Sequence, residues 1–267
     1  MKRTFAILSL FAAIIAGIAT SAAQPANAAD VPLNGHISAD LAARLHAILN
    51  DGKPHTLRVN SSGGEDAPAL ALAEDIRRNH VPVIVDGLCA GPCANYLFVA
   101  AAHRTVQPSA LVIFASSATA RLAMVPPARR NEVTGEYVQT AQAEKQLLAA
   151  AHGNEALLLE PQLQMRTECY SLTSRDRAGK AYVNYKAGFI GWVPSRAYLA
   201  RAGIPVSGFW PDSASQFQTT LQNAFPGGAR GNIAYAGVNA PSAAASLLAR
   251  LKAIRECDTG MPATPHP

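Results

Sequence analysis

The sequence is poor in charged and aromatic residues. Of its 267 residues, 15% are charged and 6% are aromatic, whereas 49% are hydrophobic. Disordered chains combine low hydrophobicity with high net charge, so this composition excludes a chain that is disordered throughout. The formal net charge is only +5, and no basic stripe with interleaved aromatic residues is present. Nucleic acid is therefore not an expected partner.

Residues 1–28 have the layout of a secretory signal peptide. Lys2 and Arg3 precede an apolar run over residues 5–19, and small residues then lead to an A-x-A site that ends at Ala28. The alternative is a membrane anchor, but a spanning helix needs about 20 apolar residues, and this run is shorter. We expect cleavage after Ala28 or Ala29 and no membrane span in the mature chain. The composition is typical of bacterial signals, so the expected location is the periplasm.

The sequence has four cysteines, and their spacing indicates whether they bind a metal, act in redox chemistry or form disulfides. Cys89, Cys93, Cys169 and Cys257 all lie in the predicted mature part. No C-x-x-C or H-x-x-x-H spacing is present, so neither a zinc site nor a redox-active pair is indicated, and nothing points to another cofactor. An even number of cysteines in an exported chain favours disulfides. Three pairings are open, and we favour Cys89–Cys93 with Cys169–Cys257.

The first half of the mature chain alternates between predicted strands and helices. Apolar runs predict strands over 56–60, 82–86 and 110–114, and helical spacing predicts helices over 38–49, 65–79 and 93–102. The run Val83-Ile84-Val85 is continuously apolar, which is typical of a strand buried on both faces. Alternation of this kind predicts an α/β fold with a parallel sheet of βαβ units.

The second half is predicted to be mostly helical. Helices are expected over 136–151, 157–167, 195–202 and 243–257, and short strands over 182–185 and 189–193 on either side of a turn. We divide the mature chain into a domain over 29–200 and a C-terminal helical extension and tail over 201–267.

Several segments of the first half together resemble a known family. These are Asn60-Ser61-Ser62-Gly63-Gly64 after a strand, Cys89-Ala90-Gly91-Pro92-Cys93 before an apolar helix, and Pro108-Ser109-Ala110 before the next strand. They are similar to exported relatives of the Clp-type serine peptidase subunit, within the ClpP/crotonase-like superfamily. The resemblance covers about residues 34–120 and implies a ClpP/crotonase-like fold and acyl-transfer chemistry.

The same resemblance implies a catalytic constellation that this sequence lacks. A family member would carry its nucleophilic serine at position 91, but Gly91 stands there. The next residue would donate an oxyanion-hole N–H, but Pro92 has none. The basic histidine would fall at Ala115. The acidic member is not placed by the resemblance, and Asp176 and Asp212 are candidates.

Gly63 and Gly64 remain, and their amides could still hold an anionic or carbonyl oxygen. We therefore predict a vestigial binding site of six residues, which are Ser62, Gly63, Gly64, Gly91, Pro92 and Ala115. The favoured hypothesis is a protein that has lost peptidase activity and acts as a peptide- or protein-binding or structural subunit. The resemblance also makes a homo-oligomer an expectation.

The alternative hypothesis is a periplasmic serine hydrolase that uses displaced residues. Ser62, Ser116 and Ser117 are its candidate nucleophiles, each of which would need a histidine within hydrogen-bonding distance. Thioester chemistry of the crotonase type is disfavoured, because Pro92 removes one of the two amide donors that it needs.

Overall fold

The computed structural model describes residues 28–125, 127–175, 181–229 and 231–256. Almost all of the predicted signal peptide therefore lies outside the described residues. Within the described ranges, no helix has the length and apolar character required to cross a membrane.

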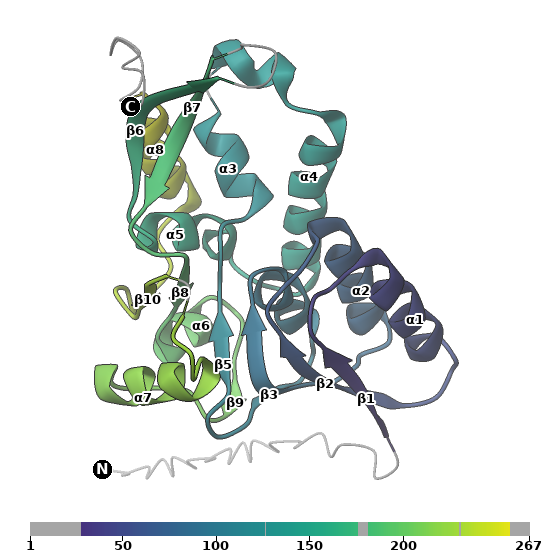
Figure 1. Ribbon diagram of the computed structural model, residues 1–267. Coiled ribbons are helices and arrows are strands. Elements are labelled where there is room, and N and C mark those ends of the chain that lie inside the picture. The colour runs from purple at the N-terminus through teal and green to yellow at the C-terminus, as the bar shows by residue number, and fades with distance from the viewer. Residues whose placement is uncertain (1–27, 126, 176–180, 230, 257–267) are drawn as a thin grey trace, which may run out of the picture.

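A parallel sheet of six strands forms the centre of the molecule (Figure 1). Its order is β1 (Ala29–Asn34), β2 (His55–Ser61), β3 (Val83–Ala90), β4 (Arg104–Val106) and β9 (Ser207–Gly208). A further strand, β5 (Leu111–Ile113), pairs with the second half of β3, whereas β4 pairs with its first half. All of these pairs are parallel, so the predicted α/β fold class is confirmed.

The helices between these strands are amphipathic or fully apolar, as their spacing predicts. Ser38 accepts a hydrogen bond from the Leu41 N–H and so caps α1 (Ala39–Leu49). Helix α2 (Asp66–Arg78) buries its Leu72 and Ile76 face, and α1 and α2 lie together beside the sheet (Figure 1). The predicted helix at 93–102 begins as the π-helix η1 (Cys93–Phe98), and all six of its residues are buried.

The end of η1 is held by a buried cation. The Arg104 side chain donates to the Phe98 carbonyl at 2.7 Å and to the Val99 carbonyl at 2.6 Å. A guanidinium at a helix C-terminus satisfies carbonyls that lack helical partners. Burial lowers the pKa of Arg104 to about 10, so it stays charged at neutral pH.

A helical part stands beyond the carboxyl ends of the strands (Figure 1). It contains α3 (Ala118–Met124), the 3₁₀ helix η2 (Pro127–Glu132), α4 (Gly135–Ala150), α5 (Ala156–Gln164) and α8 (Ala244–Glu256). A small second core of Ala120, Leu159, Leu247 and Leu251 joins α3, α5 and α8. The predicted helices at 136–151, 157–167 and 243–257 are confirmed with small shifts, whereas the sequence pattern does not predict α3.

The remaining elements complete the second half of the chain. They are β6 (Thr167–Arg175), β7 (Ala181–Ala187), β8 (Gly191–Val193), α6 (Arg196–Arg201), α7 (Ala214–Ala224) and β10 (Ile233–Tyr235). The strands expected over 182–185 and 189–193 exist, but they do not pair with each other across the turn between them. Strand β7 pairs with β6, and β8 pairs with β10. The division at residue 200 stays a prediction.

The buried carboxylate of Glu144 connects the helical part to the sheet domain. Glu144 is 1% exposed and accepts four hydrogen bonds, from the Tyr96 hydroxyl of η1, the Thr119 hydroxyl, and the N–H groups of Ala118 and Thr119. An acid at a helix N-terminus satisfies free amides and complements the helix dipole. Burial raises the pKa of Tyr96, and the Glu144 and Asp66 carboxylates raise it further, so the phenol remains a donor.

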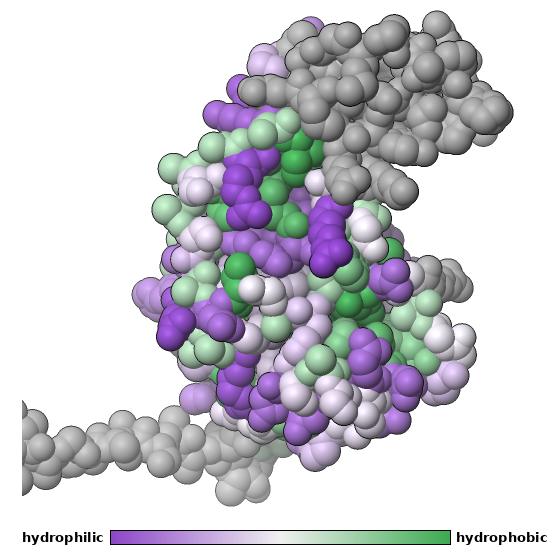
Figure 2. Space-filling model, turned by 90° about the vertical axis from the view of Figure 1, so that its left-hand side faces the viewer, coloured by the Kyte–Doolittle hydropathy of each residue, from purple (hydrophilic) through white to green (hydrophobic). Residues whose placement is uncertain are grey.

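The surface is mixed in character. Figure 2 shows one face on which small apolar patches lie between hydrophilic residues. Small apolar patches of this kind are normal on a protein surface.

Replacing Glu144 by alanine tests this connection. Glu144→Ala leaves the buried N–H groups of Ala118 and Thr119 without an acceptor and leaves the Tyr96 hydroxyl with Asp66 alone, so we expect a loss of about 3 kcal/mol in the free energy of unfolding. Urea denaturation measures it, with the exposed neighbour Gln146→Ala as control. Equal stability of the two variants would contradict the role assigned to Glu144.

Candidate functional site

The predicted site residues gather where three parallel strands end. Residues 62–64 follow β2, residues 91–92 follow β3, and Ala115 comes two residues after β5. In parallel α/β sheets, ligands bind outside the carboxyl ends of the strands. The sheet therefore places these segments at the edge where a site is expected.

The Gly63-Gly64 loop is packed too closely for side chains. Gly63 has φ +102°, and a methyl group there would lie 2.8 Å from the Ala90 carbonyl oxygen and 3.1 Å from Pro92 Cδ. A methyl group at Gly64 would overlap the backbone of Ile37. The Gly63 carbonyl accepts from the Ile37 N–H at 2.8 Å, and the Glu65 N–H donates to the Ile37 carbonyl at 2.9 Å. Both glycines are therefore required sterically, and they place the loop against the turn at residues 90–92.

A shift in strand register aims the end of β2 at that turn. The β2–β3 pairing shifts between Val59 and Ser61, and the Asn60 side chain occupies the gap. Its Oδ1 accepts the Leu88 N–H at 3.0 Å, and a methyl group at Gly87 would lie 2.6 Å from the same atom. A bulge of this kind bends a strand and redirects the residues that follow it.

Gly91 lies in a left-handed turn with open space above it. Its φ is +55°, and a methyl group added at Gly91 would have the Ala115 Cβ as its nearest neighbour, at 4.0 Å. The Gly91 N–H donates to the Ile113 carbonyl at 2.9 Å, which fixes the turn beside β5. Positions 91 and 115, which the resemblance assigns to nucleophile and base, are thus neighbours in space.

Ala115 is held by a side chain that the sequence analysis missed. The Asn95 amide donates to the Ala115 carbonyl and its oxygen accepts the Ala115 N–H, both at 3.2 Å. Asn95 lies on η1 and is 8% exposed. A lone amide in an otherwise apolar helix is the signal that could have identified it, because a buried amide needs partners.

The candidate site has few backbone N–H groups that are free to donate a hydrogen bond to an oxyanion. The Gly63 N–H donates to the Ser61 hydroxyl oxygen at 3.1 Å, and Pro92 has no N–H. The Gly64 N–H has no acceptor among the described residues. One donor can hold a carbonyl oxygen, whereas acyl transfer relies on a set of donors arranged around the developing charge.

The three candidate serines lack a histidine partner within the described residues. The Ser117 hydroxyl donates to the Leu158 carbonyl at 2.6 Å and caps α3, and the Ser116 hydroxyl contacts the Gln162 side-chain oxygen. Ser62 is exposed, and its side chain makes no hydrogen bond within that part of the chain. Two of the serines therefore have structural partners, and none has an activated geometry.

The Cys89–Cys93 disulfide is confirmed, with Cα atoms 5.3 Å apart. It closes a loop around Gly91, and chain entropy alone predicts a stabilisation of about 2 kcal/mol for so short a loop. The second pair stays a prediction, because Cys257 and the side chain of Cys169 lie outside the described residues. Asp176 also lies outside them, and Asp212 is exposed just before α7.

No three His, Cys, Asp or Glu side chains in the described ranges lie close enough together to hold a metal ion. The candidate site consists of backbone, two glycine turns, the exposed Ser62, a proline and an alanine. Such a surface can bind a peptide segment through the carbonyl and apolar groups of that segment.

Comparison with known proteins finds similarity among solved structures. No family model matches the sequence, and no curated protein matches it. Among solved structures, a variant of ClpP1 from Listeria monocytogenes matches with a TM-score of 0.35 and 19% sequence identity. The match covers 46% of this chain and 71% of that one.

Glycine-to-alanine variants test which of the two glycine turns is crowded and which has room for a side chain. We expect Gly64→Ala to lower the free energy of unfolding by about 3 kcal/mol, because its methyl group overlaps the Ile37 backbone. The methyl group of Gly91→Ala has no close neighbour. We therefore expect this variant to lose only about 1 kcal/mol in the free energy of unfolding, because alanine disfavours the left-handed φ. Gly135→Ala, with nothing within 4 Å, is the control. Urea denaturation ranks the three, and a Gly91→Ala variant as unstable as Gly64→Ala would contradict the open turn.

Proposed function

We propose that this chain is an exported, non-catalytic relative of the Clp-type serine peptidases that binds a peptide or protein segment at the candidate site. The observation that carries the proposal is the pairing of positions 91 and 115. A Cβ added at Gly91 would lie 4.0 Å from the Ala115 Cβ, yet neither position carries a polar side chain. The nucleophile is absent although the turn has room for one.

Three further features support binding without hydrolysis. The Gly64 N–H is a donor without an acceptor in the described part of the chain, so it can hold a peptide carbonyl. Pro92 removes a second oxyanion donor. Asn95 holds both backbone groups of Ala115, so the loop is anchored to η1. A preordered surface loses less entropy on binding.

The export part of the proposal rests on the signal-like segment and the disulfide. Both Cys89 and Cys93 are fully buried in the linked turn, and structural disulfides persist in oxidising compartments. The bacterial periplasm is such a compartment. A homo-oligomer is a further expectation of the resemblance, and analytical ultracentrifugation of the mature chain would test it.

Loss of peptidase activity is tested with a serine-reactive probe. We expect the chain from residue 29 to remain unlabelled by a fluorophosphonate and inert towards casein, and expect Ser62→Ala, Ser116→Ala and Ser117→Ala to change neither result. A revertant carrying Gly91→Ser, Pro92→Ala and Ala115→His is the matched comparison. Labelling of the natural chain that disappears in one serine variant would establish the displaced-hydrolase alternative and refute the proposal.

Binding is tested separately from catalysis. Ala115→Tyr fills the space above Gly91, so we expect it to weaken the binding of fluorescein-labelled casein peptides at least about tenfold, measured by anisotropy. Ala149→Tyr, on an exposed position of α4, is the control. Natural protein that binds no peptide, or equal binding by both variants, would count against this site.

A further inference from the structure

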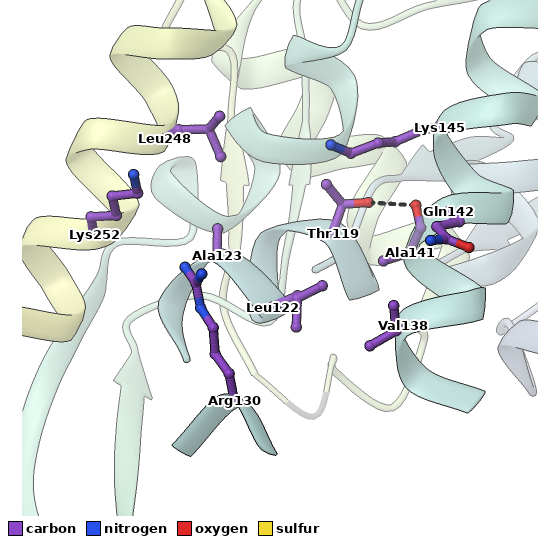
Figure 3. Close-up of a pocket in the computed structure, with 10 residues that line it drawn as sticks. All are labelled: Thr119, Leu122, Ala123, Arg130, Val138, Ala141, Gln142, Lys145, Leu248 and Lys252. Carbon is purple, nitrogen blue, oxygen red and sulfur yellow. Dashed lines mark hydrogen bonds between the residues drawn. The ribbon is translucent and has the colours of Figure 1, made fainter. Parts of the chain in front are cut away.

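A cavity lies away from the candidate site, between α3, α4 and α8 (Figure 3). Its volume is about 440 Å³, which falls within the usual range of small-molecule sites, about 300–1,000 Å³. Each helix contributes one face to it, with Leu122 on α3, Val138 on α4 and Leu248 on α8. The three helices thus form an apolar pocket, which we call the three-helix pocket.

The apolar side chains of the three-helix pocket are incompletely covered. Leu122, Val138 and Leu248 are all half-buried, while the neighbouring face of α8 packs against α3 and α5 through Leu247 and Leu251. Covering apolar surface is favourable by about 25 cal/mol per Å². A ligand with an apolar body would therefore be stabilised here.

The charged residues that line the pocket are all basic. Arg130, Lys145 and Lys252 come from η2, α4 and α8, and no acidic side chain lines the cavity within the described part of the chain. Figure 3 shows these three side chains placed around the apolar groups from different sides. Lys145 is 3.1 Å from Glu155, whereas Arg130 and Lys252 form no ion pair among the described residues. Cations gathered at a concave site raise its affinity for an anion.

The dimensions favour a small ligand over a protein segment. Helix α3, which contributes Thr119, Leu122 and Ala123, has seven residues and is about 10 Å long. A docked helix needs apolar contacts over two turns or more, at i, i+3, i+4 and i+7. Such a stripe is about 10 Å long and would cover α3 from end to end, whereas the cavity volume of about 440 Å³ is that of a small-molecule site, with Arg130 at its border (Figure 3).

We propose that the three-helix pocket binds an amphiphilic anion, with its apolar chain against Leu122, Val138 and Leu248 and its single anionic head near Arg130 and Lys252. A medium-chain carboxylate has this chemistry. The inference does not depend on the proposed function, because the pocket shares no residue with the candidate site.

Titration calorimetry with dodecanoate, below its micelle concentration, tests the proposal on the mature chain. We expect saturable one-to-one binding that weakens at least about tenfold with octanoate, because four buried methylene groups are lost. Dodecanol, which lacks the charge, is expected to bind at least about tenfold more weakly than dodecanoate. Ala115→Tyr is expected to bind dodecanoate normally, which separates this site from the peptide site.

Charge-reversal variants test whether Arg130 and Lys252 bind the anionic head. Arg130 and Lys252 are exposed and hold no other element in place within the described residues, so Arg130→Glu with Lys252→Glu is expected to fold and to lose at least about tenfold in dodecanoate affinity. Arg250→Glu lies on the same helix outside the pocket and is the control. No saturable binding, equal binding of dodecanol, or equal loss in the control would overturn the proposal.

Discussion

The buried carboxylate of Glu144 is the interaction on which the arrangement of the molecule depends. It accepts hydrogen bonds from η1, which follows the disulfide-linked turn, and from the first amides of α3, which follows Ala115. One side chain of α4 thereby fixes the two segments that flank the candidate site. A buried charge is tolerated only when its hydrogen bonds are satisfied, so the three elements must assemble together.

The same arrangement separates the two surfaces to which we assign binding. The candidate site lies at the carboxyl ends of the strands, and its structure comes from backbone contacts, including the close approach of Gly63 to Ala90 and Pro92. The three-helix pocket lies beside α3, and its character comes from side chains on three helices. The first surface suits carbonyl groups of an extended chain, whereas the second suits an apolar body with a negative head.

Local patterns predicted much of the sheet domain. The apolar run Val83-Ile84-Val85 predicted the central strand, and helical spacing over 38–49 predicted α1. Other elements could not be predicted, because they are stabilised by contacts with residues far away along the chain. Strand β9 has two residues and depends on pairing with β4. Helix α3 is short, and its N-terminus is stabilised by Glu144, which is 26 residues away from Ala118 along the chain. The strands on either side of residues 186–188 pair with other strands, because strand order is decided by long-range contacts.

By itself, the sequence determined the alternation of strands and helices, the two glycine turns and the absence of serine and histidine at positions 91 and 115. These are properties of residue type and short-range spacing, which do not depend on tertiary contacts. Only the tertiary structure decided that Gly91 faces Ala115, that Asn95 holds Ala115, and that Arg130, Lys145 and Lys252 surround one apolar pocket. Those contacts join residues far apart in the chain, so they arise from the packing of helices on the sheet and on one another.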